Sequence, residues 1–189
     1  MMSPQRHTYA VEVAGLTRSL PLFEIAPGIH IAILNILGDT ELVRAAAAAL
    51  SEQLQAYDVD LLITAEAKSI PLAYQLAVNM NLPYIVLRKT YKPYMGEAMS
   101  VETLSITTGR PQQLFLDEKD LALVQGRRVA LIDDVISTGS TIKAMEQLTR
   151  DAQGQVVIKA AIFTEGDAES MGGVVALGHL PVFTNGTLP

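Results

Sequence analysis

The sequence predicts an α/β fold in which a parallel sheet is flanked by helices, and three observations carry this prediction. Short apolar runs, each as long as a buried strand, alternate with helical patterns between residues 59 and 163. The chain has 189 residues, which suit one compact domain with a sizeable core. Hydrophobic residues make up 49% of it, and no repeat or low-complexity tract occurs. Repeated strand-then-helix units form right-handed crossovers, so we expect parallel strands that are covered on both faces.

The composition excludes several classes of site and partner. The chain has no Cys, which excludes thiolate zinc sites, iron–sulfur clusters, a Cys nucleophile and disulfides. Its 14 basic and 20 acidic residues give a net charge of −6, which argues against nucleic-acid or anionic-membrane partners. No apolar stretch has the length of a signal peptide at the amino terminus or of a membrane span elsewhere. We therefore expect a cytoplasmic protein that holds any phosphate by local geometry.

The first helix is expected to begin at Asp39 or Thr40, either of which can cap it. Apolar residues then recur at a spacing of four, which is typical of one buried helix face. These residues are Leu42, Ala46, Leu50 and Leu54. The apolar run at residues 59–64 follows as a strand buried on both faces.

The second helix and strand have equally clear limits. Ser69, with Pro71 just inside, opens a helix, and Asn81 and Pro83 close it. A second buried strand follows at residues 84–89, with the sequence YIVLRK.

Two further strands surround a third helix. Residues 127–133 form an apolar run that leads through a Ser/Thr/Gly turn into a helix with Gly154 as its stop. Residues 156–163 give the fourth strand. In parallel sheets the ligand binds beyond the carboxyl ends of the strands, so the candidate site lies just after each run.

One segment interrupts the alternation. Residues 90–117 contain two runs typical of strands, at 99–106 and 112–116, joined by the sequence TTGRP. They predict a β-hairpin that projects from the sheet. Insertions of this length inside a compact domain are functional lids or flexible loops.

The segment VALIDDVISTGST, residues 129–141, carries the most chemical information. A buried strand delivers two adjacent carboxylates, Asp133 and Asp134, to the ligand edge of the sheet. The turn into the next helix then consists of Ser137, Thr138, Gly139, Ser140 and Thr141. Amide groups at a helix start, together with hydroxyls and a permissive glycine, suit a phosphate dianion. Carboxylates repel a phosphate unless they bind something else, and sugar hydroxyls are groups that they would bind.

Two other interpretations of this segment are weaker. An Asp pair that only caps the next helix would explain one Asp but not the hydroxyl-rich turn. A nucleotide-binding strand of the Walker B type also ends in two acids, but no GxxxxGK[ST] sequence precedes it here.

The segment resembles the signature of the type I phosphoribosyltransferases, which is an apolar strand, two acids, a short link and a TGxT-like loop. The resemblance implies that family's fold, with an N-terminal hood at about residues 1–38 and a flexible hairpin at about residues 90–117, in a single domain spanning 1–189. It implies that Asp133 and Asp134 are catalytic, and that residues 137–141 bind the 5′-phosphate of 5-phosphoribosyl 1-pyrophosphate (PRPP). It further implies a homodimer, and Mg²⁺ carried by PRPP rather than caged by the protein.

Two other segments resemble the purine branch of this family. TAEAKSIPLAYQLA looks like its pyrophosphate loop, although the family usually has Gly where Ser69 stands, and LPYIVLRKTYKP looks like its strand followed by Arg-Lys. The implied pyrophosphate-binding residues are Glu66, Ala67, Lys68, Ser69, Arg88, Lys89 and Lys92.

The identity of the base stays open in the sequence. PGIHIAILNILGDTELV resembles the hood over the purine; its PGI is like the adenine enzymes, whereas Leu34-Asn35 followed by Asp39 is closer to the xanthine enzymes. Adenine enzymes also carry an acid followed by Tyr in the hairpin, where this chain has Thr107 and Thr108. The implied purine-binding residues are Asn35, Val135 and Glu165.

The resemblance implies a purine phosphoribosyltransferase, with adenine as the leading base and xanthine as the alternative. The rival is a non-catalytic regulator that senses PRPP with the same fold. One such family places a winged-helix DNA-binding domain ahead of this fold, and the segment before Pro27 is short for that purpose.

Overall fold

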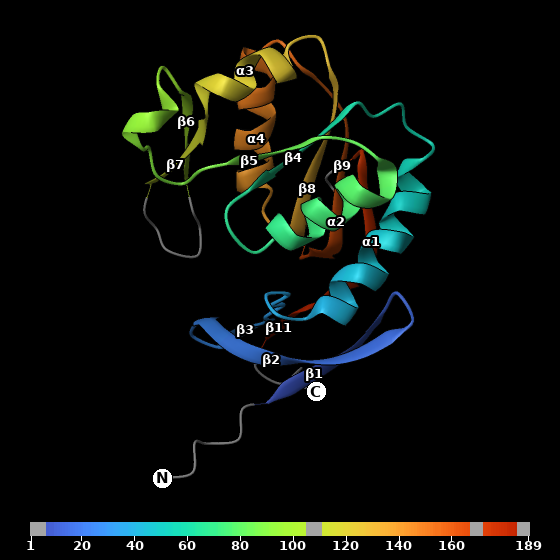
Figure 1. Ribbon diagram of the computed structural model, residues 1–189. Helices are drawn as coiled ribbons and strands as arrows, with labels where there is room; N and C mark the ends of the chain where they lie inside the picture. The colour runs from blue at the N-terminus through green and yellow to red at the C-terminus, as the bar shows by residue number, and fades with distance from the viewer. Residues whose placement is uncertain (1–6, 105–110, 167–171, 185–189) are drawn as a thin grey trace.

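The computed structural model describes residues 7–104, 111–166 and 172–184. Its centre is a parallel five-stranded sheet in the order β10-β9-β8-β4-β5 (Figure 1). The strands are β4 (Leu61–Ala65), β5 (Tyr84–Leu87), β8 (Arg128–Ile136), β9 (Gln155–Glu165) and β10 (Val174–Leu180). The parallel sheet confirms the fold class that the sequence predicts.

Two strands differ from the expectation. Strand β8 does not end at Asp133 but continues through the acid pair to Ile136, because Val135 and Ile136 keep pairing with β9. Strand β10 was not expected at all. It pairs with β9 at the edge of the sheet, where Gly178 packs so closely on Phe163 that an added Cβ would lie 2.8 Å from the ring.

Helices cover both faces of the sheet. They are α1 (Thr40–Leu54), α2 (Ile70–Met80), α3 (Glu118–Val124) and α4 (Ser140–Asp151). Asp39 caps α1 as predicted, accepting a hydrogen bond from Leu42 N at 3.0 Å. None of these described helices combines the length and apolar character that crossing a membrane requires.

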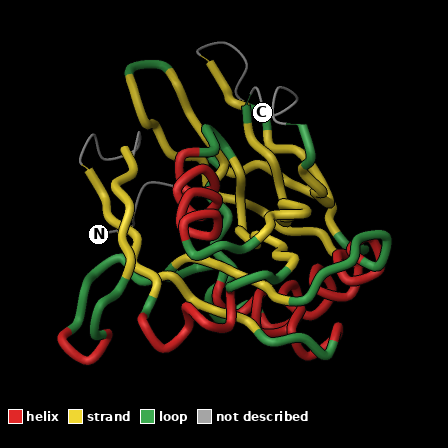
Figure 2. The backbone as a smooth tube through the Cα atoms, turned by 90° about the horizontal axis from the view of Figure 1, so that it is seen from above, coloured by secondary structure: helices red, strands yellow, loops and turns green. Residues whose placement is uncertain are grey.

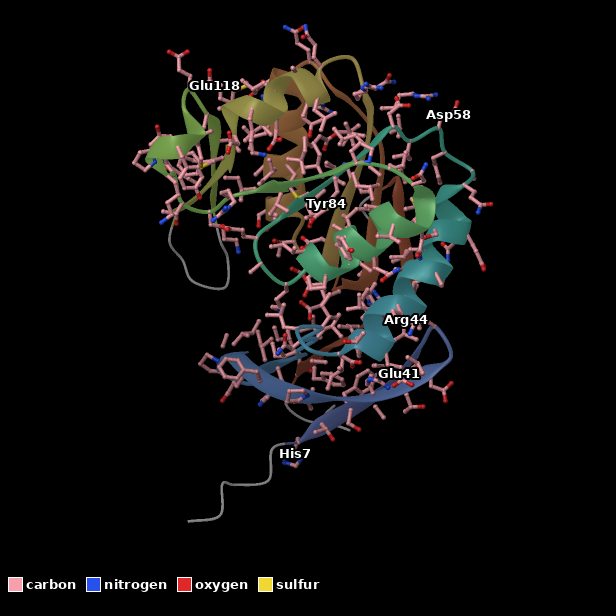
Figure 3. All side chains as sticks on the ribbon, in the orientation of Figure 1. His7, Glu41, Arg44, Asp58, Tyr84 and Glu118 are labelled. Carbon is pink, nitrogen blue, oxygen red and sulfur yellow. The ribbon has the colours of Figure 1, made fainter. Side chains whose placement is uncertain are left out.

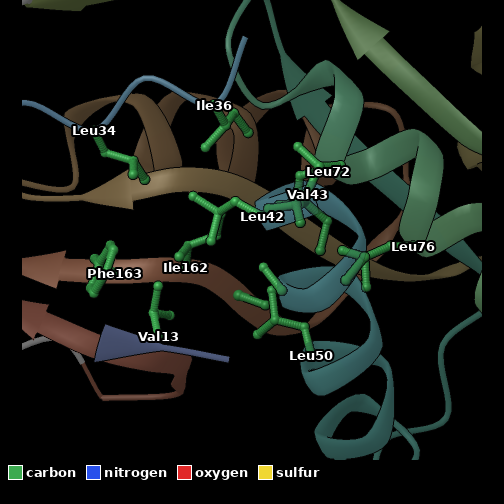
Figure 4. Close-up of a cluster of buried hydrophobic side chains, with 14 of the residues drawn as sticks. Val13, Leu34, Ile36, Leu42, Val43, Leu50, Leu72, Leu76, Ile162 and Phe163 are labelled. Carbon is green, nitrogen blue, oxygen red and sulfur yellow. The ribbon is translucent and has the colours of Figure 1, made fainter. Parts of the chain in front are cut away.

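The core has two parts, one on each face of the sheet. In the first, shown in Figure 4, Leu42 and Leu50 of α1 and Leu72 and Leu76 of α2 pack toward Ile162 of β9. The second holds the buried face of α4, which consists of Ile142, Ala144, Met145 and Leu148. All four of these α4 residues are at most 5% exposed, so burial of this face fixes the start of α4 against the end of β8.

A smaller antiparallel sheet lies below the main sheet in Figure 1. Its order is β1-β2-β3-β11, and its strands are β1 (Thr8–Val13), β2 (Leu16–Ala26), β3 (Ile29–Ala32) and β11 (Val182–Thr184). The sequence analysis assigned no strands to this region, whose last strand comes from the far end of the chain. Arg18 of β2 holds the sheet to α1 through Asp39, at 2.7 Å, and Glu41, which Figure 3 labels beside this sheet.

The predicted hairpin consists of β6 (Met99–Leu104) and β7 (Pro111–Leu116), which are antiparallel. Its connection at residues 105–110, with Thr107 and Thr108, lies outside the described residues. The 3₁₀ turn η1 (Pro93–Met95) precedes it. Figure 2 draws β6 and β7 among the yellow strands, as a unit separate from the central sheet.

Candidate active site

The turn from β8 into α4 forms an open hollow of about 200 Å³ at the carboxyl edge of the sheet. Gly139 is the N-cap of α4 and has φ 74° and ψ 8°, a left-handed conformation that glycine adopts without strain. The hollow is lined by Asp133, Val135, Ile136, Ser137, Thr138, Gly139, Ser140, Thr141 and Ile142. The structure thus brings together all five residues predicted to bind a phosphate.

This lining contains no basic side chain among the residues that the structure describes. The first amides of α4 have no acceptor within the helix, as at any helix start, and they carry its positive partial charge. Thr138 and Ser140 add hydroxyls, whose oxygens lie 3.4 Å apart. The hollow can therefore hold an anion through amides and hydroxyls without a cationic side chain.

Asp133 of the acid pair lines this hollow, and Asp134 follows it on β8. Asp133 accepts a hydrogen bond from the backbone N–H of Asp134 at 2.9 Å. Burial, and then repulsion by Asp134, raise the pKa of Asp133 to about 8. Asp134 is buried, and its Oδ2 accepts no hydrogen bond from any described residue. That oxygen is available to a donor on a ligand.

The second turn, residues 66–69, connects β4 to α2 at the same edge. Ser69 occupies the N-cap position of α2 but makes no side-chain cap. Its buried hydroxyl lies 3.2 Å from Ala65 O and 2.9 Å from the hydroxyl of Thr64, which in turn lies 2.8 Å from Ile132 O. The sequence analysis missed Thr64, although a hydroxyl inside an otherwise apolar strand was a usable signal.

Lys68 joins this turn to the acid pair. Its Nζ lies 3.5 Å from Asp134 Oδ2 and donates to the carbonyl of Leu34 at 3.1 Å. Burial raises the pKa of Glu165, at the end of β9, and the charge of Lys68 opposes this rise. The acid pair, the turn after β4 and the segment after β3 thus meet around one lysine.

The remaining predicted residues lie around this centre. Glu66 forms an ion pair with Arg88 and accepts a hydrogen bond from the backbone N–H of Lys89 at 2.8 Å. Asn35 is exposed and accepts a hydrogen bond from Leu37 N at 3.2 Å. Lys92 precedes the turn η1 and is exposed.

Within the described ranges, no group of three or more metal-binding side chains is arranged to hold a metal ion. The residues present fit a Mg²⁺ ion that arrives on a phosphorylated ligand, because Asp134 Oδ2, which faces Lys68 but accepts no hydrogen bond from a described residue, can accept one from a metal-bound water or a sugar hydroxyl.

A sequence profile of the family described as phosphoribosyl transferase domain matches residues 32–171. The chain belongs to this family. Among relatives, the chain is 28% identical over 148 residues to the purine biosynthesis transcriptional repressor PurR of Bacillus subtilis, and the match covers 78% of this chain and 51% of that protein. It is 32% identical over 114 residues to a hypoxanthine/guanine phosphoribosyltransferase of Methanocaldococcus, and the match covers 60% of this chain and 55% of that protein. It therefore spans about half the length of these relatives.

The fold of this chain is similar to that of solved structures of phosphoribosyltransferases. The adenine phosphoribosyltransferase of Rhodothermus marinus superposes with a TM-score of 0.64 at 22% identity, covering 92% of this chain and 94% of that chain. This likeness confirms the fold expected from the acid pair and the hydroxyl-rich turn.

Proposed function

We propose that this chain is a purine phosphoribosyltransferase that transfers the phosphoribosyl group of PRPP to a purine and releases pyrophosphate. The observation that carries the proposal is the Asp133–Asp134 pair at the edge of the hollow formed by the start of α4. A sugar phosphate satisfies both halves of this site, since amides take the phosphate and carboxylates take the ribose hydroxyls. A phosphate alone would not account for two carboxylates beside the anion site.

The chemistry is a displacement at the anomeric carbon of the ribose. A purine nitrogen forms a bond to that carbon, the bond to the pyrophosphate oxygen breaks with its electron pair, and the nitrogen releases its proton. The ribose passes through a state with oxocarbenium character, which the carboxylate charge of the Asp133–Asp134 pair beside it stabilises. The hairpin β6–β7 excludes water, which would otherwise attack the same carbon.

The departing pyrophosphate is assigned to the turn after β4 and to the end of β5. Cationic side chains neutralise it, and the amides of the turn orient it. The proposed set is Glu66, Ala67, Lys68, Ser69, Arg88, Lys89 and Lys92. Mg²⁺ that is bound to PRPP would neutralise further charge on the leaving group.

The base is assigned to the space beside Asn35, Val135 and Glu165, and adenine is the proposed base. The fold likeness to adenine phosphoribosyltransferases supports adenine. Xanthine is the alternative, because Leu34 and Asn35 resemble the xanthine enzymes. An assay of pyrophosphate release with Mg²⁺, PRPP and adenine, xanthine, guanine, hypoxanthine or orotate tests this choice. Turnover with adenine is expected to exceed the others, and turnover with none of them would overturn the enzymatic proposal.

A PRPP-sensing regulator is the second candidate. The observation in its favour is that a transcriptional repressor matches 78% of this chain. Such a protein would bind PRPP at the same hollow without turnover, so binding in the absence of any nucleobase-dependent pyrophosphate release would favour it. A homodimer is proposed for both candidates. A cytoplasmic location is also proposed for both, because PRPP is a charged metabolite that does not cross a bilayer unaided.

A further inference from the structure

Glu66 is an acid in a turn assigned to a polyanion. It directly follows β4, and its side chain is 24% exposed. A carboxylate at that position repels pyrophosphate unless its charge is already committed to another partner. Its contacts therefore decide what it does.

Both carboxylate oxygens of Glu66 are committed to the end of β5. Oε1 forms an ion pair with Nε of Arg88, and Oε2 accepts the backbone N–H of Lys89 at 2.8 Å. The backbone is fixed in the same direction, because Glu66 N donates to Leu87 O at 3.0 Å. This geometry follows from the parallel pairing of Ala65 with Leu87, which places the residues after each strand side by side.

We propose that Glu66 is a positioning residue, which holds Arg88 and the backbone of Lys89 in place for pyrophosphate without contacting pyrophosphate itself. The contact to Glu66 uses Nε of Arg88, and guanidinium carries further N–H donors on its two terminal nitrogens. A free arginine side chain loses rotamer entropy when a ligand orders it. Glu66 orders the arginine before the ligand arrives, so less of that cost falls on binding.

The Glu66–Arg88 pair also lies where three segments meet. Arg88 exchanges two backbone hydrogen bonds with Phe115 of β7, at 2.9 and 2.8 Å, beside its contact with the pyrophosphate turn. Removing Glu66 therefore affects the end of β5 and the base of the hairpin together. The test must separate this positioning from a general loss of structure.

The inference rests on the proposed function, and its test is a double-mutant cycle read out by binding. Isothermal titration with magnesium pyrophosphate and with ribose 5-phosphate is carried out on the full chain, Glu66→Gln, Arg88→Ala and the double variant. Glu66→Gln is expected to weaken pyrophosphate binding about tenfold, the size of one charge-assisted contact. The double variant is expected to bind no more weakly than Arg88→Ala, because Glu66 acts through the arginine.

Two further readouts exclude a merely structural effect. Ribose 5-phosphate binding is expected to stay within about twofold in Glu66→Gln, since its phosphate goes to the start of α4. In turnover, KM for PRPP is expected to rise while kcat changes little, as for a contact that helps bound substrate and transition state equally. Glu146→Gln is the matched control, because Glu146 also pairs with an arginine, Arg150, but on α4 outside the site.

Losses that add up in the double variant would overturn the inference, as would unchanged or tighter pyrophosphate binding in Glu66→Gln. Loss of ribose 5-phosphate binding in Glu66→Gln would also overturn it, because the effect would then extend to the whole site. If the unaltered chain binds neither PRPP nor pyrophosphate, the proposed function itself fails. That outcome is distinct from a failure confined to Glu66.

Discussion

The turn from β8 into α4 and the turn from β4 into α2 lie at the same edge of the sheet but present opposite surroundings to an anion. The first opens on Gly139 and lines its hollow with amides and hydroxyls. The second buries Ser69 and commits Glu66 and Lys68 to ion pairs. Anion binding at the first turn therefore depends on backbone shape, whereas at the second it depends on charge.

The largest effect is expected from Gly139→Val, which changes the backbone conformation at the start of α4. A β-branched residue at φ 74° is strained and crowds the start of α4, so PRPP binding is expected to weaken more than about a hundredfold. Isothermal titration with PRPP measures it.

Gly126→Val is the matched control for this substitution. Gly126 has φ 73° and nothing within 4 Å of an added Cβ, so it carries the same backbone strain in the turn before β8, on the opposite edge of the sheet. It is expected to lose a similar stability, about 1–2 kcal/mol, and to keep PRPP binding. Equal loss of binding in both variants would contradict the importance of the first turn.

Asp134→Asn tests the residue that lies between the two turns. Asn has nearly the same shape as Asp but lacks the charge that faces Lys68 and that is proposed to hold the ribose. Turnover is expected to fall about ten- to a hundredfold, which corresponds to one charge-assisted contact in a desolvated site. Asp151→Asn, at the far end of α4, is the control and should keep full turnover. Unchanged kinetics in Asp134→Asn would remove the ribose-holding role.

The sequence predicted the first turn better than the second for a physical reason. Every group of the first turn comes from one continuous segment, 133–141, so the sequence alone indicates which groups lie together there. The second turn depends on partners that are distant in sequence: Glu66 meets Arg88 only because β4 and β5 are neighbours, and Lys68 meets Leu34 only after the sheet has formed.

The strands were predicted unevenly for a related reason. Central strands such as β4, which is buried throughout, are continuous apolar runs. Strand β10 is an edge strand that contains Gly178. A glycine in a sequence usually indicates a turn, but this one allows close packing against Phe163. Strand β1 has only an alternating pattern, with Val11 and Val13 buried between exposed neighbours.

Lys68→Met tests the dependence of the second turn on charge. Pyrophosphate binding is expected to weaken about tenfold and to become less sensitive to salt, because one exposed cation is lost. Ribose 5-phosphate binding at the first turn is expected to change little. Titrations of both ligands at two ionic strengths measure the contrast, and an equal change for both ligands would contradict the separation of the two turns.

The smallest expected effect is a gain in stability for Asp133→Asn. The pKa of Asp133 is raised from 3.8 to about 8, so between these values folding requires the carboxyl to take up a proton. The free energy of unfolding of the natural chain therefore falls as pH rises through that window, and Asn avoids this fall. At pH 8 the variant should therefore be more stable than the natural chain and should melt at a higher Tm.

Thermal melts at pH 4, 6 and 8 check this dependence. The gain should be smallest at pH 4, where the carboxyl is protonated in the folded state and about half protonated in the unfolded state. An equal gain at every pH would show that repacking, rather than the carboxyl, is responsible.

A crystal structure with magnesium and PRPP tests the account most directly. We expect the 5′-phosphate within hydrogen-bond distance of the amides of residues 138–141 and the ribose hydroxyls against Asp133 and Asp134. A sugar phosphate bound elsewhere, with these two carboxylates unengaged, would contradict it.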